Sequence, residues 1–229
     1  MIVRMGLLTR KQGLSSEDFR RHWLSVHGPL AARLPGLRRY HQNHVVDSRQ
    51  LAIDHARGNW AIDGISELWF DSVGDMQRAI SSDAYRDVAQ DHVRFVGNTG
   101  LITAEQNIVV PVDASGAPLV KRMSILTRKP GLTAEQFKEE WWGFHAEAVK
   151  KFPNLMGYTQ NFVTDRSSGF GRPEPYEALP IDGMVELWFR SIADIETAFR
   201  SPAADVSQTH ALSFIAEITT FLVETHEVI

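Results

Sequence analysis

Cysteine is absent from the 229 residues of this chain. Its absence excludes disulfide bonds, thiolate catalysis, iron–sulfur clusters and zinc sites that depend on cysteine. Long apolar runs are absent as well: no stretch approaches the roughly 20 residues that cross a bilayer, and the N-terminus has no signal-peptide core. We therefore expect a cytoplasmic protein with no membrane partner.

The chain also lacks an excess of positive charge. Its 24 lysines and arginines are spread among 28 aspartates and glutamates, which gives a net charge of −4. Without a basic stripe, a nucleic-acid partner is not expected. The sequence has no glycine-rich phosphate loop and no GxSxG motif, so it supports neither a nucleotide cofactor nor serine hydrolysis. We expect no cofactor.

The nine histidines do not form a metal-binding pattern. His41 and His44 are three positions apart in an expected strand, so they face opposite sides of a sheet. His22 and His27 are five positions apart in an expected helix, where their side chains diverge by about 140°. The sequence therefore predicts no metal site.

The main feature that is present is an internal repeat. A stretch that starts at Met5 matches one that starts at Met123, an offset of 118 residues (123 minus 5). The matched pairs include Thr9/Thr127, Gly13/Gly131, Phe19/Phe137, Trp23/Trp141, His27/His145, Pro35/Pro153 and Tyr40/Tyr158. After a one-residue shift, Glu67 matches Glu186 and Trp69 matches Trp188. A period this long indicates a duplicated domain. We expect module one at 1–112, a linker at 113–119 and module two at 120–229.

Each module shows the same succession of patterns. Apolar alternation predicts strands, and helical spacing predicts a first helix that Ser15 caps and a second that breaks near Ser81–Asp83. In module one, the expected strands are 3–9, 37–46, 62–70 and 101–110, and the expected helices are 15–34 and 73–96. The resulting order, β-α-β-β-α-β, is that of a ferredoxin-like fold.

Both faces of the first expected strand are apolar, with Val3, Met5 and Leu7 on one side and Leu8 on the other. Helices cover only one face of such a sheet, so the other face needs a cover too. We therefore expect an α+β protein in which two ferredoxin-like modules pack sheet to sheet within one chain, as two copies do in a homodimer.

His27 and its counterpart His145 are the leading catalytic candidates. Phe19, Trp23 and His27 recur at i, i+4 and i+8, so they share the apolar face of the first helix. An imidazole in a pocket between helix and sheet suits proton transfer at neutral pH. The alternative is a core histidine whose ring nitrogen is satisfied by a backbone carbonyl.

Tyr40 and its counterpart Tyr158 are the second pair of catalytic candidates. Strand alternation places Tyr40, Gln42 and His44 on one face, where the phenol could border the same cavity as His27. The alternative is a sheet tyrosine whose hydroxyl reaches water or backbone. The expected substrate-binding residues are Trp23, Gln42, His44, Trp141 and Gln160.

Two further features have both a functional and a structural interpretation. Glu67 and Glu186 lie inside apolar strands, where each could be a base with a raised pKa or could pair with an arginine of the facing module. For the two glutamates, pairing with an arginine is the favoured interpretation. The long polar loops at 47–60 and 165–180 are expected to be lids, with the alternative of mobile surface loops.

The run Lys129–Thr133, followed by Phe137, Trp141 and His145, resembles the EthD family, and module one repeats this pattern. The stretch from Pro153 to Asn161 resembles the family as well. The resemblance implies an intrachain dimeric α+β barrel. It also implies chemistry without metal or organic cofactor, in which His27 acts with Tyr40, and His145 with Tyr158.

The family resemblance implies roles in ether degradation, polyketide processing and lactone isomerisation. Our first hypothesis is a cofactor-independent isomerase, cyclase or decarboxylase (a lyase) that acts on a small cyclic or aromatic acid, lactone or polyketide-like compound. The alternative is a non-catalytic accessory protein that binds a small ligand, and a third hypothesis is a haem-handling protein. Exposed sheet edges would also allow two tandem chains to form a homodimer.

Overall fold

The computed structural model describes residues 1–113, 116, 118–168 and 171–229. The expected linker at 113–119 therefore lies partly outside the described residues, as does the middle of the expected lid at 165–180. Both modules show the β-α-β-β-α-β order. No helix within the described ranges has the length and apolar character needed to cross a membrane.

The elements of module one match the expected segments closely. They are β1 (Ile2–Arg10), α1 (Ser16–His22), the π-helical segment η1 (Trp23–His27), α2 (Gly28–Ala31), β2 (Leu37–Asp47), β3 (Gly64–Phe70), α3 (Val73–Ile80), α4 (Asp83–Phe95) and β4 (Val96–Val110). Serine side chains cap the N-termini of two helices. Ser15 accepts a hydrogen bond from the Asp18 N–H at the start of α1, and Ser82 accepts one from the Tyr85 N–H at the start of α4.

Module two repeats these elements, with two short additions after its second strand. They are β5 (Val120–Arg128), α5 (Ala134–Glu140), the π-helical η2 (Trp141–His145), α6 (Ala146–Val149), β6 (Gly157–Ser168), β7 (Arg172–Pro173), η3 (Tyr176–Ala178), β8 (Gly183–Phe189), α7 (Ile192–Phe199), α8 (Pro202–Phe214) and β9 (Ile215–Glu227). Thr133 and Gln136 form a capping box at the start of α5.

The expectation of two separate sheets packed face to face is wrong. The strands form one antiparallel sheet in the order β4-β1-β3-β2-β9-β5-β8-β6-β7, and an additional β4–β6 pairing closes eight of them into a barrel. The physical reason is strand length. With 15 and 13 residues, β4 and β9 extend beyond their own modules and hydrogen-bond to β6 and β2 of the other module.

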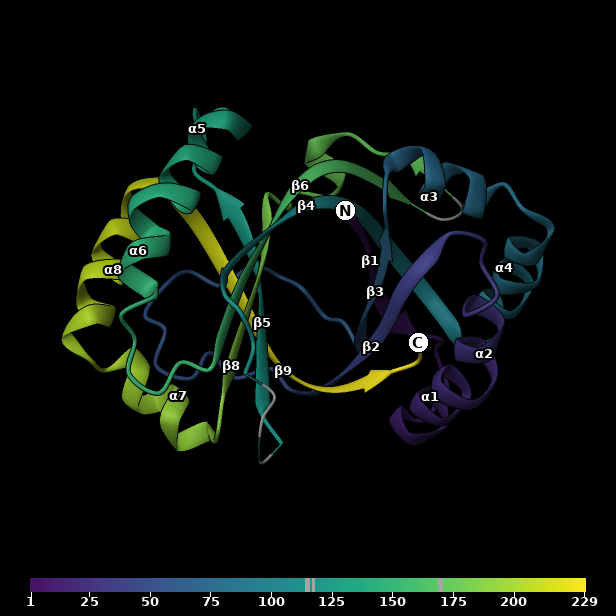
Figure 1. The fold of residues 1–229 in the computed structure, drawn as a ribbon, viewed down its shortest axis with the longest axis horizontal. Coiled ribbons are helices and arrows are strands. Elements are labelled where there is room, and N and C mark those ends of the chain that lie inside the picture. Colours follow the sequence, from purple (N-terminus) through teal and green to yellow (C-terminus); the bar gives the residue numbers. More distant parts are fainter. Residues whose placement is uncertain (114–115, 117, 169–170) are drawn as a thin grey trace.

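The inward faces of the eight barrel strands form the central core of the molecule. Val3, Met5 and Leu7 of β1 belong to this core. They form the apolar strand face that we expected to be covered. The helices of the two modules cover opposite outer sides of the barrel (Figure 1). Each outer side therefore has a helix–sheet interface, and the barrel interior separates the two interfaces.

The loop between β2 and β3, residues 48–63, leaves module one and crosses to the outer side of module two (Figure 1). Gln50 Nε2 donates to the Ile218 carbonyl at 2.9 Å, and His55 Nε2 lies 3.1 Å from the Ile215 carbonyl. We call this segment the crossing loop. Ile53 and His55 of the crossing loop line the cavity beside His145 in module two. The loop contributes no residue to the cavity beside His27 in its own module.

Candidate functional site

The first candidate site lies between the first helix and the sheet of module one. The helix widens into a π-helical turn from Trp23 to His27, and both end residues are buried. Single π-helical turns occur frequently at functional sites. Trp23 is fully buried because its ring lies over Gly64, where a Cβ would meet Cζ3 at 2.2 Å. The glycine thus sets how deeply this helix packs.

Two side chains hold the Tyr40 hydroxyl in this site. Trp23 Nε1 and Gln42 Nε2 each donate to the hydroxyl oxygen at 3.0 Å, and Gln42 also donates to the Trp23 carbonyl at 2.8 Å. Burial raises the pKa of Tyr40, so the phenol stays protonated. Because its oxygen already accepts two hydrogen bonds, the hydroxyl proton is available for donation to a ligand.

A carboxylate orients the imidazole of His27. Asp91 of α4 lies with Oδ2 3.0 Å from His27 Nδ1, and its other oxygen lies 2.9 Å from His22 Nε2. His27 is 6% exposed and Asp91 is 3% exposed. Burial lowers the pKa of His27, and the hydrogen bond and charge of Asp91 partly oppose that shift. At neutral pH the ring is therefore neutral, with Nδ1–H donated to Asp91.

Module two has lost this orientation. The position of His22 is taken by Glu140 and the position of Asp91 by His210, and these two residues pair at 3.0 Å. The acid and the base have thus exchanged places. Within the described part of the chain, His145 Nδ1 is buried without a hydrogen-bond partner. Burial, and the charge of His210, lower the pKa of His145 to about 3.

A cavity of about 60 Å³ lies beside His27. Its polar lining consists of Arg4, His27, Tyr40, Ser66, Tyr85, His92 and Thr99. Arg4 is only 9% exposed, and its nearest hydrogen-bond partner is the Tyr85 hydroxyl at 3.4 Å. None of the ion pairs formed by the described residues includes Arg4. This guanidinium is the natural contact for a negative charge on a ligand.

Sequence reasoning missed Arg4 and Asp91, although signals for both exist. Arg4 and Arg122 occupy equivalent positions inside two apolar strands, and a recurrent arginine in such a strand indicates a buried role. Asp91 lies three residues after Val88 and four before Phe95, on the buried face of α4. The first helix alone could not reveal it, because the partner of His27 is 64 residues away in the sequence.

The second helix–sheet cavity, also about 60 Å³, lies beside His145. Trp141 and Tyr158 line it, and His55 of the crossing loop contributes from module one. Gln160 Nε2 donates to the Tyr158 hydroxyl and to the Trp141 carbonyl, each at 2.7 Å. The rest of the cavity wall is mostly apolar. Module two therefore keeps the shape of the site but lacks a carboxylate equivalent to that of Asp91.

Three of the expected substrate-binding residues do not line either cavity. Gln42 and Gln160 are fully buried and hold the tyrosines, as described above. His44 stacks on Trp23 with ring centroids 4.6 Å apart, and its Nε2 lies 3.1 Å from Gln42 Oε1. Burial lowers the pKa of His44 to about 3. These side chains support the site from behind, whereas Trp23 and Trp141 line it.

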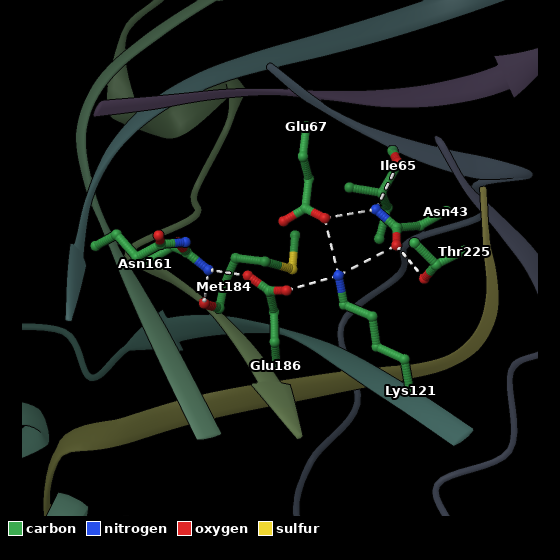
Figure 2. Close-up of polar contacts among 9 residues, drawn as sticks. Asn43, Ile65, Glu67, Lys121, Asn161, Met184, Glu186 and Thr225 are labelled. Carbon is green, nitrogen blue, oxygen red and sulfur yellow. Dashed lines mark hydrogen bonds and ion pairs between the residues drawn. The ribbon is translucent and has the colours of Figure 1, made fainter. Parts of the chain in front are cut away.

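The barrel interior contains a third polar cluster, which Figure 2 shows. The ammonium of Lys121 lies 2.8 Å from Glu67 Oε2 and 2.6 Å from Glu186 Oε2. The expected arginine partner of the two glutamates is therefore wrong: one lysine, Lys121, lies between both carboxylates and pairs with each of them. Asn43 and Asn161 donate to the carboxylates at 2.7 and 2.6 Å.

The two glutamates of this cluster have opposite pKa shifts. Burial, and the negative charge of Glu67, raise the pKa of Glu186 to about 7. Burial also acts to raise the pKa of Glu67, but the charge and hydrogen bond of Lys121 outweigh it and lower that pKa. At neutral pH, Glu67 is ionised and Glu186 is close to its titration midpoint.

The histidine sites fit neither a metal ion nor a haem group. No three histidine, aspartate or glutamate side chains among those described lie close enough together to hold a metal ion. A haem held by His27 or His145 would need a large open space beside the imidazole. Pockets for drug-sized molecules have about 300–1,000 Å³, whereas each of these two cavities has about 60 Å³. Neither histidine site fits a porphyrin.

Comparison with solved structures shows the same fold over nearly the whole chain. An anthrone oxidase-like protein has a TM-score of 0.65 at 9% identity, covering 99% of this chain and 93% of that one. A Lactobacillus acidophilus NCFM protein whose name contains the word monooxygenase has a TM-score of 0.60 at 10% identity, covering 98% and 93%. A haem-bound DypB variant of Rhodococcus jostii RHA1 has a TM-score of 0.51 at 8% identity, covering 97% and 92%.

At these identities, the structural likenesses establish the fold and not the chemistry. No curated protein sequence matches the chain. The sequence profile of the EthD domain matches twice, over residues 11–99 and 129–216, one match in each module. Together the two matches span most of the chain, and the protein therefore belongs to the EthD family.

Proposed function

We propose that this protein is a cofactor-independent small-molecule enzyme whose working site is the helix–sheet cavity of module one. The reaction is an isomerisation, cyclisation or decarboxylation of a small cyclic or aromatic acid, lactone or polyketide-like compound. The observation that carries the proposal is the buried His27–Asp91 pair, 3.0 Å apart, beside a cavity that Tyr40 and Arg4 also line.

The pair supports a base at His27 Nε2. Asp91 accepts the Nδ1 proton and fixes the tautomer, so the lone pair of Nε2 is free to remove a proton, as in other carboxylate–histidine pairs. The low pKa of His27 keeps the ring neutral and ready to accept that proton. A general base in such a position contributes about 10²–10⁴-fold to the rate.

The remaining polar groups suit the charge that this step creates. When His27 takes a proton from a carbon next to a carbonyl, the carbonyl oxygen becomes an enolate. Arg4 supplies a positive charge for that oxygen or for a substrate carboxylate, and Tyr40 supplies a hydrogen-bond donor. Return of the proton from His27 to a different carbon completes an isomerisation, with no gain or loss of atoms.

The size of the cavity limits what enters it. A space of about 60 Å³ takes the reacting end of a substrate, while the rest of the molecule stays nearer the surface. In module two, the cavity has a similar volume and keeps its tyrosine, but no carboxylate orients His145. This difference favours a second function for that half: it binds a ligand without proton transfer.

A ligand screen followed by turnover assays tests the proposal. Aromatic acids, lactones, phenols and anthrone-type polyketide fragments are screened by thermal shift. Oxygen uptake is also recorded, because the names of two fold neighbours contain the words monooxygenase and oxidase. A ligand at about 100 times its Kd raises stability by roughly 2.7 kcal/mol.

The matched variants are His27→Ala and His145→Ala. We expect turnover of the stabilising compounds by the wild type and by His145→Ala, and a loss of about 10²–10⁴-fold in His27→Ala. Equal activity of the two variants would contradict the proposal. So would a complete lack of binding combined with lower melting temperatures in both variants, because the histidines would then be structural.

A further inference from the structure

A third and much larger cavity lies at one end of the barrel. Its volume is about 930 Å³, within the range of about 300–1,000 Å³ that is typical of ligand pockets. Both modules contribute equivalent wall residues, Trp69 and Trp188, and its polar floor is the cluster of Lys121 and Glu186 in Figure 2. This cavity is separate from the His27 and His145 sites, which lie outside the barrel.

The charges at the floor do not balance. Two buried carboxylates, Glu67 and Glu186, share the single ammonium of Lys121. The position equivalent to Lys121 in module one is Val3, so the second cation that a symmetric pair of modules would supply is missing. At the rim, Glu224 and Glu227 add negative charge, and Arg39 adds positive charge.

Buried polar atoms near the cavity lack hydrogen-bond partners. Among the described residues, none hydrogen-bonds to Glu67 Oε1 or to the Nε1 of Trp69. Glu67 is fully buried, and Trp69, which lines the cavity, is 3% exposed. Such atoms are costly in a folded protein unless a ligand or water satisfies them, and of the two only the carboxylate oxygen can accept a hydrogen bond from an ammonium.

We propose that this cavity binds a small organic cation: a protonated amine attached to an apolar or aromatic body. The amine would supply a second positive charge beside Glu186, the glutamate of the pair that lines the cavity. The indole walls already bind cations, since the Arg39 guanidinium lies 4.5 Å from the Trp69 ring and the Lys121 ammonium 5.1 Å from the Trp188 ring. The apolar body would occupy the space beside Leu222 and Val223.

Binding of a cation is coupled to loss of a proton. The groups that face Glu186 across the floor and walls are Lys121, Glu67, His41, Arg39, Glu224 and Glu227. Because the pKa of Glu186 is about 7, this carboxyl is largely protonated at pH 6 and largely ionised at pH 8. A bound ammonium favours the ionised form, so affinity should rise by about tenfold between these pH values.

Calorimetric titration with benzylamine, which is a cation throughout this pH range, tests the inference. Benzyl alcohol is the neutral compound of similar shape. We expect benzylamine to bind more tightly at pH 8 than at pH 6, with a proton release that shows as different heats in two buffers. We expect benzyl alcohol to bind at least tenfold more weakly. Equal binding of the two compounds, or no pH dependence, would overturn the inference without any variant.

Variants then locate the site. Glu186→Gln should abolish both the proton release and most of the affinity, while the rim variant Glu224→Gln keeps the proton release. If Glu186→Gln fails to fold, Trp188→Leu should weaken benzylamine binding instead. His27→Ala should leave benzylamine binding unchanged, which separates this site from the proposed catalytic one. Retention of full affinity in both Glu186→Gln and Trp188→Leu would place the ligand elsewhere and overturn the inference.

Discussion

At the scale of single residues, two equivalent histidines differ because the residue opposite each one differs. His27 faces Asp91 and is held by it, whereas His145 faces His210 and has a buried nitrogen without a partner in the described chain. The sequence identified both histidines. It could not distinguish them, because the side chain that decides their chemistry lies on a different helix.

Replacement of Asp91 by asparagine tests the orientation of His27. Asp91→Asn removes the charge that accepts the Nδ1 proton, so we expect turnover to fall by about 10–1,000-fold, at most the full contribution of a general base. Steady-state kinetics with the substrate found in the screen measures this loss. Glu140→Gln, at the exchanged pair of module two, is the matched control and should retain activity. Unchanged activity in Asp91→Asn would remove the carboxylate from the mechanism.

The low pKa of His145 makes stability depend on pH. Its pKa is about 3 in the folded protein and about 6.5 when unfolded. Between these values the unfolded chain binds one more proton, so this residue's contribution to stability is complete above pH 6.5 and declines as the pH falls. The slope is about 1.4 kcal/mol per pH unit.

His145→Leu should therefore flatten the pH dependence of stability by about 1.4 kcal/mol per pH unit between pH 4 and 6. Urea unfolding of the wild type and the variant at several pH values measures the two slopes. If the unfolding free energies of the wild type and the variant had the same pH dependence, His145 would not be held neutral in the folded protein.

At the scale of elements, the succession of strands and helices was predictable because the periodic patterns are strong. The break between α3 and α4 and the Ser15 and Thr133 caps are confirmed. The π-helical turns were not predictable, since five residues of η1 keep the same apolar face that an α-helix would show. The glycine beneath each tryptophan appeared in the sequence only as a repeated Asp-Gly pair.

That glycine gives a prediction for the contact between helix and sheet. In Gly64→Ala, the new Cβ would lie 2.2 Å from Trp23 Cζ3, and in Gly183→Ala 2.5 Å from Trp141 Cζ3. Each variant should lose about 1–3 kcal/mol of unfolding free energy, because the helix must move away from the strand. Gly74→Ala, where the nearest atom is 3.6 Å away in α3, is the control and should be neutral or stabilising. Unaltered stability of Gly64→Ala in denaturant titrations would contradict the tight contact.

At the scale of the whole molecule, the repeat and the need to cover the inner sheet face were evident from the sequence. The sheet-to-sheet packing inferred from them was wrong because pairing between modules depends on strand ends. Nothing in the apolar alternation of β4 and β9 shows that they continue across to another module. Closure gives all eight barrel strands a neighbour on both sides, so among the described strands only the short β7 keeps a free edge of the kind expected to support a homodimer.

A closed barrel should unfold as one unit even though it contains two copies of a module. We expect a single calorimetric transition whose van't Hoff and calorimetric enthalpies agree. The variant Gly183→Ala, which changes only module two, should lower the Tm of that one transition. Two resolved transitions, of which the substitution shifts only one, would show that the modules are independent.

The position of β9 also determines when the molecule can become complete during synthesis. Its residues pair with β2, so His41 meets Glu227, 186 positions later (227 minus 41), and the Tyr40 N–H donates to the carbonyl of Ile229. A ribosome therefore releases the partner of β2 after all the other strands of the barrel. Until then module one has an unpaired strand edge, which is a site for wrong pairing and for chaperone binding. Closure over so long a sequence separation is expected to be a slow, late step of folding.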